Sequence, residues 1–87
     1  MDEQRKKIDR IDRTLLRLLD ERMELAEIIG KIKGEKGLPV YDAAREAEVL
    51  QKLRSLPARS IGNDEVQELF QHIIRISRRH GERGMRR

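Results

Sequence analysis

The chain contains no cysteine or tryptophan, and its aromatic residues are one tyrosine and one phenylalanine. The lack of cysteine excludes a disulfide framework and any site built on a thiolate. It also suits a reducing compartment, so we expect a cytoplasmic protein. Two aromatic residues and a formal net charge of only +4 argue against a nucleic-acid-binding protein.

Long apolar runs are also missing. No segment has the length and apolarity of a signal peptide or a membrane span, so we expect no membrane association. Charged residues make up 41% of the chain and apolar residues 37%, which would leave a single globule of 87 residues with a thin core. The apolar residues nevertheless recur at helical spacing, and we expect them to be buried against a partner chain.

The longest regular segment runs from Asp2 to about Lys36, with no proline and no glycine before Gly30. Its apolar residues step by three and four positions, as on one face of a helix: Ile8, Ile11, Leu15, Leu18, Leu25, Ile29 and Ile32. Such a helix is about 50 Å long, whereas a compact chain of this size is about 30 Å across. Dimerisation through this helix is the simplest prediction, with a long coiled coil as the alternative.

Two shorter helices are expected to follow. The second begins after Asp42, which stands in the position of an N-terminal cap, and runs to about Ser55. The third begins at Asn63 or Asp64, and Asp64 and Gln67 have the spacing of a capping box. No segment alternates as a strand does, so the predicted fold class is all-α, with three helices per chain and a long first helix.

The C-terminal residues differ from the rest in composition. Gly81 and Gly84 mark the expected end of the third helix, and the final stretch RRHGERGMRR holds five arginines in ten residues. We therefore predict a helical domain over residues 1–81 and a flexible basic tail over residues 82–87. An acidic partner enzyme is one candidate ligand for this tail.

Two cations interrupt the apolar face of the first helix. Arg22 falls on it, and Lys33 lies eleven residues on, within about 20° of the same direction. One interpretation is that both side chains snorkel, with their stems covering apolar surface. The other is that an anion pairs with Arg22, because a buried guanidinium without one is costly. That anion is either a carboxylate of the protein or a ligand.

Two further polar residues are weaker candidates. Ser77 follows Ile73 by four positions on the apolar face of the third helix, where a bond to its own helix carbonyl would explain it. Arg5 lies about 25 Å along the first helix from Arg22 and about 100° around it. One straight helix cannot bring both to one site, but an antiparallel helix dimer can. A solvated terminal charge is the alternative for Arg5.

Other catalytic arrangements are not recognisable. His72 and His80 have no acidic cluster at metal-ligand spacing, and neither a Ser/His/Asp pattern nor a phosphate-binding glycine loop occurs. A site of Arg, Lys, Ser and carboxylates suits the binding of a small polyanion. If it catalyses a reaction, it does so by holding one conformer and stabilising developing charge.

Three stretches of the chain carry the positions of a known family. They read RKKIDRIDRTLLRLLDERMELAEIIGKIK, LPVYDAAREAEVL and LFQHIIRIS. The first contains I-D-x-I-D-x-x-L-L-x-L-L-x-E-R-x-x-L-A-x-x-I-G-x-x-K from Ile8 to Lys33, and the second contains the D-x-x-R-E of Asp42, Arg45 and Glu46. Over nearly its whole length the chain therefore resembles the all-α chorismate mutases of the AroQ class.

This resemblance implies an intertwined homodimer of three-helix chains with two equivalent sites. The implied reaction is the Claisen rearrangement of chorismate to prephenate in phenylalanine and tyrosine biosynthesis, without cofactor or metal. By the same match, Arg22 and Arg45 would hold the two substrate carboxylates, with Ser77 assisting. Arg5 would come from the partner subunit.

The match also implies roles for the remaining site residues. Lys33 would donate to the ether oxygen, and Glu46 would accept from the ring hydroxyl beside Asp42. One position departs from the family, because Gly81 stands where a Gln or Glu usually supplies a second donor to the ether oxygen. Either the activity is weaker than usual, or His80 substitutes, or the end of the third helix is arranged differently.

Two other functions remain open at the level of the sequence. An isochorismate pyruvate-lyase-like enzyme would react a similar dianion in a similar pocket, although the D-x-x-R-E stretch favours the mutase. A non-catalytic helical binding module, docking a partner enzyme of the shikimate pathway, is the alternative from a different class.

Overall fold

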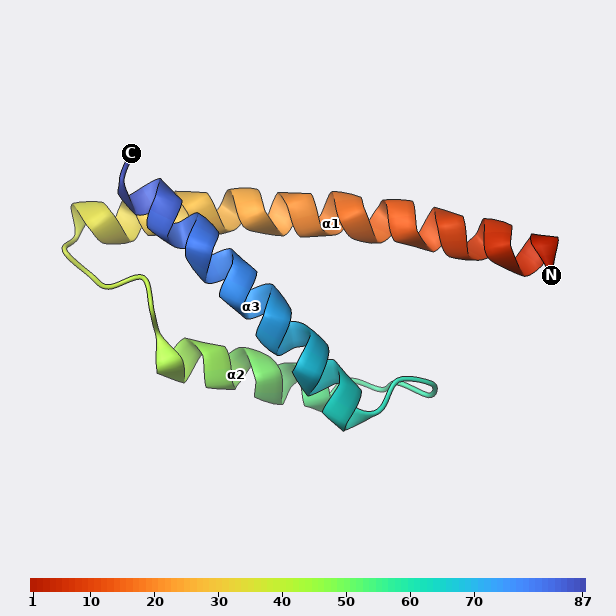
Figure 1. The fold of residues 1–87 in the computed structure, drawn as a ribbon. Coiled ribbons are helices and arrows are strands. Elements are labelled where there is room, and N and C mark those ends of the chain that lie inside the picture. The colour runs from red at the N-terminus through yellow and green to blue at the C-terminus, as the bar shows by residue number, and fades with distance from the viewer.

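The computed structural model describes all 87 residues and contains three α-helices joined by two loops (Figure 1). Helix α1 spans Asp2–Glu35, α2 spans Ala43–Arg54 and α3 spans Asn63–Met85. No strand is present, which confirms the all-α class and the long first helix. None of the three helices combines the length and the apolarity that a membrane span needs.

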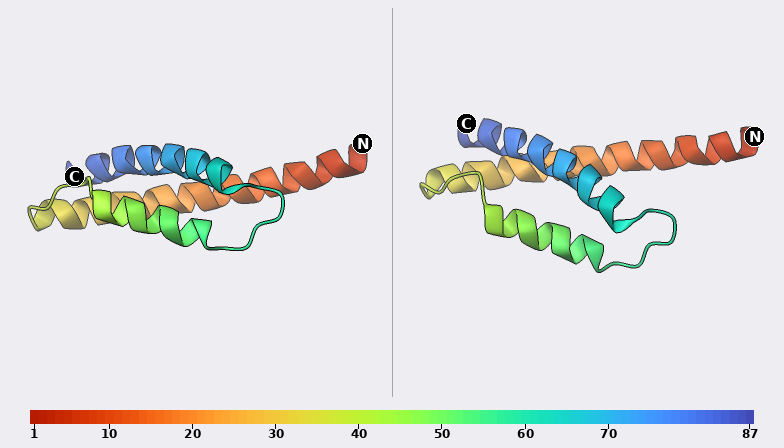
Figure 2. Two further views of the ribbon diagram at one scale, coloured as in Figure 1. Left: turned by 90° about the horizontal axis from the view of Figure 1, so that it is seen from below. Right: turned by 60° about the horizontal axis from the view of Figure 1, so that its bottom comes forward.

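The molecule is elongated. Its principal extents are 52 × 25 × 15 Å, and its radius of gyration is 15.5 Å, against about 12 Å for a compact chain of this length. The cause is α1, whose 34 residues correspond to about 51 Å of helix. The N-terminal part of α1 projects beyond α2 and α3 in all views (Figures 1 and 2).

Helix α3 crosses the C-terminal half of α1, and α2 packs on α3 (Figure 2). Glycines allow the two long helices to approach closely at this crossing. A Cβ added to Gly30 would lie 1.9 Å from the carbonyl oxygen of Gly81, and one added to Gly84 would lie 2.0 Å from that of Glu27. The backbones of α1 and α3 are therefore in direct contact.

The core of one chain is thin, as its composition predicts. Ile73 and Ile74 are its only buried apolar side chains. The apolar face of α1 is 45–57% exposed along its length, at Ile8, Ile11, Leu15, Leu18, Leu25, Ile29 and Ile32. A stripe of this extent is typical of a helix that packs against another chain.

The N-terminal cap of α2 is the predicted one, whereas the cap of α3 differs from the sequence prediction. The Asp42 carboxylate accepts from the backbone N–H of Arg45 at 3.0 Å, which confirms the predicted cap. The cap of α3 is Gly62, whose backbone N–H donates to Glu65 Oε1 at 3.0 Å, so the predicted Asp64/Gln67 box is wrong. The reason is register, since the cap lies before Asn63 and the acidic partner three residues on is then Glu65.

The predicted end of α3 also differs. The helix continues through Gly81 and Gly84 to Met85 because both glycines are buried against α1 rather than fraying into solvent. The boundary drawn at residue 81 therefore lies inside a helix.

Candidate active site

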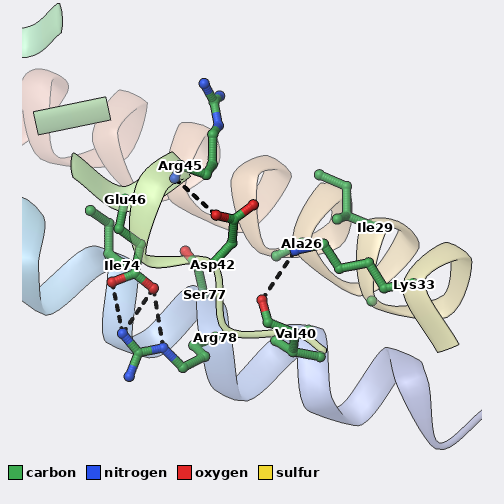
Figure 3. A pocket seen from close by; sticks show the side chains of 12 residues that line it. Ala26, Ile29, Lys33, Val40, Asp42, Arg45, Glu46, Ile74, Ser77 and Arg78 are labelled. Atoms are coloured by element: carbon green, nitrogen blue, oxygen red, sulfur yellow. Dashed lines mark hydrogen bonds and ion pairs between the residues drawn. The ribbon is translucent and has the colours of Figure 1, made fainter. Parts of the chain in front are cut away.

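A cavity of about 130 Å³ opens where the start of α2 faces the crossing of α1 and α3 (Figure 3). Its polar lining combines one residue of α1, the cap and two first-turn residues of α2, and two residues of α3: Lys33, Asp42, Arg45, Glu46, Ser77 and Arg78. Its apolar lining comes from Ala26, Ile29, Val40 and Ile74, with Gly30 and Gly81 at the helix crossing. Five of the seven predicted site residues thus gather in one place.

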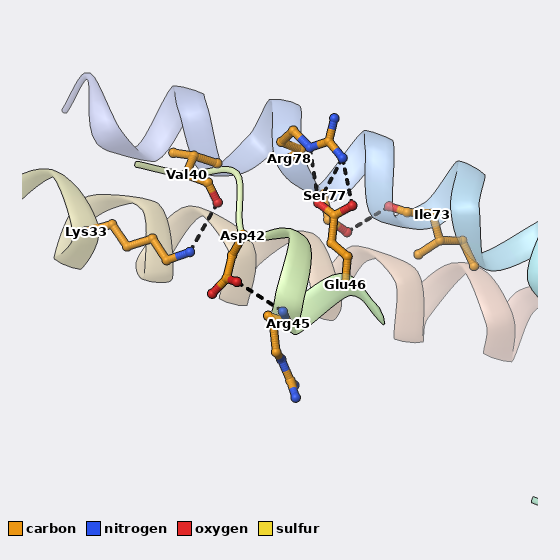
Figure 4. A network of polar contacts seen from close by, with 8 residues as sticks. All are labelled: Lys33, Val40, Asp42, Arg45, Glu46, Ile73, Ser77 and Arg78. Carbon is orange, nitrogen blue, oxygen red and sulfur yellow. Dashed lines mark hydrogen bonds and ion pairs between the residues drawn. The ribbon is translucent and has the colours of Figure 1, made fainter. Parts of the chain in front are cut away.

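Lys33 extends along the cavity from α1. Its Nζ donates to the carbonyl oxygen of Val40 at 3.1 Å (Figures 3 and 4). An ammonium has three donors, so Lys33 retains others for a ligand. This contact places the positive charge beside the loop that leads into α2.

Arg22 and Ser77 meet across the α1–α3 contact. Arg22 Nη1 donates to Ser77 Oγ. The Ser77 hydroxyl in turn donates to the carbonyl oxygen of Ile73 at 2.8 Å (Figure 4). The helix-carbonyl bond expected for an isolated serine is therefore present together with the arginine contact. Arg22 is half-buried next to the cavity, and its burial, with the nearby charge of Arg45, lowers its pKa.

Arg45 lies at the mouth of the cavity with its guanidinium turned outward (Figure 3). It pairs with Glu48 Oε1 at 2.6 Å, and both side chains are more than half exposed. This pair, together with the bond from its N–H to Asp42, explains how an arginine is tolerated in the first turn of a helix. To contact a ligand in the cavity, the Arg45 guanidinium would have to release Glu48 and turn inward.

The Glu46 side chain points away from the Arg45 guanidinium and pairs with Arg78 of α3 (Figures 3 and 4). Arg78 Nη2 lies 2.8 Å from each carboxylate oxygen, and Nε lies 3.2 Å from Oε2. The carboxylate raises the pKa of Arg78 by accepting these bonds. Sequence reasoning missed Arg78, because an arginine in an arginine-rich stretch carries no periodicity signal.

Arg5 is not brought to the cavity. It is exposed near the start of α1 and makes no ion pair within the chain. Within a single chain, Arg5 and Arg22 therefore do not reach the same site, as the spacing along the first helix predicts.

The two neighbours of Gly81 do not line the cavity either. His80 lies 3.5 Å from Glu27 Oε2 on α1, and Glu82 faces a groove with Arg75, Arg78 and Arg79. The backbone of α3 holds Gly81 itself at the cavity wall. The expected alternative in which His80 replaces the missing donor is therefore contradicted by its position.

The electrostatics of the cavity favour an anion. Arg22 and Lys33 donate only to neutral oxygens, those of Ser77 and Val40, and neither has a carboxylate partner. The charge of Glu46 is compensated by Arg78. No three His, Asp or Glu side chains are grouped as metal ligands. The arrangement can bind carboxylates and stabilise negative charge that develops near Lys33.

Comparisons with known proteins agree with this geometry. The sequence matches the family described as chorismate mutase type II over residues 4–82. It is 45% identical over 73 residues to a bifunctional chorismate mutase/prephenate dehydratase of Aquifex aeolicus, covering 84% of this chain and 20% of that protein. The chain thus spans about a fifth of the length of the first curated relatives it matches.

Two solved structures have the same fold over almost their whole length. Chorismate mutase (form II) from Thermus thermophilus superposes with a TM-score of 0.92 at 38% identity, covering 94% of this chain and 93% of that one. Chorismate mutase from Helicobacter pylori in complex with prephenate gives 0.89 at 29% identity, covering 98% and 92%. With the family match over nearly the entire sequence, these likenesses show that the chain belongs to the chorismate mutase type II family, the all-α AroQ class.

Proposed function

We propose that this protein catalyses the rearrangement of chorismate to prephenate. The observation that carries the proposal is a pair of cations without any carboxylate partner: Lys33 lines the cavity, and Arg22 lies next to it, bonded to the lining residue Ser77. A substrate with two carboxylates supplies the missing charge. The relative from Helicobacter pylori is described in complex with prephenate, the product of this reaction.

The rearrangement breaks an ether C–O bond and forms a C–C bond within one molecule, so no proton donor, nucleophile or redox group is needed. Arg22, supported by Ser77, and Arg45 bind the carboxylates and hold the reacting ends together. Lys33 donates to the ether oxygen as negative charge grows there. Glu46 accepts from the ring hydroxyl, and Asp42 fixes the first turn of α2 beside it.

A product assay tests this function. Purified protein is incubated with chorismate without added cofactor, and prephenate is measured after its acid conversion to phenylpyruvate. Formation of prephenate is the expected result. A parallel incubation with isochorismate distinguishes the lyase, because salicylate without prephenate would overturn the mutase assignment. Absence of either product would favour a binding module.

We also propose that the active form is an intertwined homodimer. The apolar face of α1 is exposed in one chain. The cavity of about 130 Å³ is smaller than the range of about 300–1,000 Å³ typical of small-molecule sites. A second copy packed along α1 would bury the apolar face and would add the walls that the cavity lacks in one chain. In such a dimer Arg5 of the partner subunit would complete the ring of cations around the substrate.

Arg5 and Arg22 permit a complementation test of the shared site. The Arg5→Ala and Arg22→Ala homodimers are each expected to be nearly inactive. A mixed dimer with one substitution per chain has one site lacking both arginines and one intact site. After subunit exchange, an equal mixture is therefore expected to regain up to about one quarter of wild-type activity.

Sedimentation and a mixture of each variant with itself provide the controls. A folded monomer at micromolar concentration would contradict the dimer. If the dimer forms and exchange is demonstrated by labelled chains, absence of any regained activity would show that Arg5 is not shared.

The missing donor at Gly81 gives a further prediction. A side chain there would point into the cavity, but its Cβ would lie 3.0 Å from Val40 Cγ1. In a Val40→Ala background, which removes that methyl group, Gly81→Gln is expected to raise kcat by about tenfold because it adds a donor near the ether oxygen. Gly81→Leu in the same background is the control for size. Equal rates for the two variants would contradict a donor role.

Two other expectations remain predictions: a cytoplasmic location, and docking of the basic C-terminal residues on a partner enzyme of the shikimate pathway. The absence of cysteine supports the first, and the five arginines of the last ten residues support the second.

A further inference from the structure

The contact between Arg78 and Glu46 joins α3 to the beginning of α2. The two side chains are 32% and 25% exposed, so the pair is partly withdrawn from solvent. Its three hydrogen bonds fix the plane of the carboxylate. Helix α2 has no buried residue, so packing alone holds this helix only weakly. The ion pair therefore restrains both the direction of Glu46 and the place of its helix.

Arg78 is itself restrained from a third segment. Its guanidinium carbon lies 4.4 Å from the centre of the Tyr41 ring, in cation–π contact with the loop that precedes α2. Tyr41, Glu46 and Arg78 thus form one connected group from the loop, α2 and α3. An arginine side chain that is already restrained on two sides loses less conformational entropy when it orients a partner than one restrained on a single side.

The same pair separates two cavities. Glu46, Ile74 and Arg78 line the candidate active site and also a second cavity of about 380 Å³, whose other lining residues are Leu50, Gln71 and Arg75. The side chains of Glu46 and Arg78 therefore belong to the wall between them. Removal of the Arg78 side chain would join the two cavities and admit water beside Glu46.

The charge of Glu46 needs compensation at this position. An ionised carboxylate next to a site for a dianion repels the ligand that it is meant to contact. Arg78 offsets this repulsion while it uses three of the roughly four acceptor positions of the carboxylate. An acceptor position is left for a ligand hydroxyl.

We propose that Arg78 is a positioning residue of the active site, which orients the Glu46 carboxylate toward the substrate hydroxyl and neutralises it against the substrate dianion. This inference rests on the proposed function. Arg78 acts through Glu46 and does not itself touch the reacting atoms. The residue lies directly after Ser77, so α3 contributes two adjacent side chains to the pocket, one in contact with α1 and the other with α2.

A double-mutant cycle tests the proposal in the full-length protein. Arg78→Met keeps the apolar stem and is expected to raise KM for chorismate by about tenfold, with a smaller change in kcat, since a partly exposed charge pair is lost next to a bound anion. Arg78→Lys should recover part of this loss because it keeps the charge without the fork geometry. In a Glu46→Gln background, Arg78→Met should change KM by less than about twofold.

Arg79→Met is the matched control, because Arg79 is an exposed neighbour on α3 without an ion pair. Its kinetics should equal those of the wild type. If Arg78→Met has the same effect with and without Glu46→Gln, or if it only lowers Tm, the positioning role is overturned while the proposed function stands. If the wild type forms no prephenate, the proposed function is overturned, and this inference with it.

Discussion

Lys33→Met is expected to lower kcat by about 10²–10³-fold while the protein stays folded. A single preorganised donor to a developing oxyanion contributes about this much to a rate. Gly81 has no side chain to supply the second donor that the resemblance implies, and His80 lies beside Glu27, so in the proposed mechanism Lys33 is the only donor to the ether oxygen. Methionine keeps the unbranched stem that lines the cavity, and only the ammonium is lost.

Lys31→Met is the matched control for this substitution. Lys31 lies about 200° away around α1, is exposed and makes no ion pair within the chain. Its kcat should stay within about twofold of the wild type, since an exposed substitution away from the site has little effect. Stopped assays of prephenate with circular dichroism on both variants make the comparison. Loss of less than tenfold in Lys33→Met would show that another group stabilises the ether oxygen.

The helices were the predictable part of this molecule. Apolar spacing of three and four over more than thirty residues predicts a helix that one chain cannot cover, and α1 is that helix, with its apolar face exposed. Asp42 was predictable as a cap, because a carboxylate directly before a run of helix formers is typical of an N-terminal cap. The cap of α3 was not recognisable, since Gly62 has no side chain and offers only a backbone donor.

Site residues were predictable one at a time, but their partners were not. Arg22 and Ser77 each stood out as a polar residue on an apolar face, yet their contact joins positions 55 apart, which periodicity within a helix cannot reveal. The Glu46–Arg78 pair joins positions 32 apart and gave no local signal at all. The outward turn of Arg45 toward Glu48 likewise depends on which face of α2 the cavity occupies.

For the glycines of α3 the sequence prediction is wrong. Glycine is a poor helix former, so Gly81 and Gly84 predict a fraying helix end. In the structure both are buried where α3 crosses α1, and the lack of side chains allows backbone contact. Sequence alone does not distinguish a glycine that ends a helix from one that permits a close crossing, because the difference lies in the second helix.

This crossing leads to the second large prediction, that Gly30→Ala lowers the free energy of unfolding by about 3 kcal/mol or more. The added Cβ would lie 1.9 Å from the Gly81 carbonyl oxygen and 2.8 Å from its Cα. Backbone atoms cannot rotate out of the way, so α1 and α3 must separate. The corresponding fall in Tm is about 10–20 °C for a domain of this size. Activity should fall too, since Gly30 and Gly81 both line the cavity.

Gly34→Ala, one helical turn away, separates this steric cause from the general effect of replacing glycine in a helix. Its Cβ would lie 3.1 Å from Met85 Cγ and 3.2 Å from the Met85 carbonyl oxygen, at the last residue of α3, where a small shift is easy. The gain in helix propensity, about 1 kcal/mol, should offset most of that strain and leave Tm within a few degrees of the wild type. Thermal unfolding of the two variants at equal protein concentration measures the difference. Similar Tm values for both would mean that α1 and α3 are farther apart at Gly30 than the structure places them.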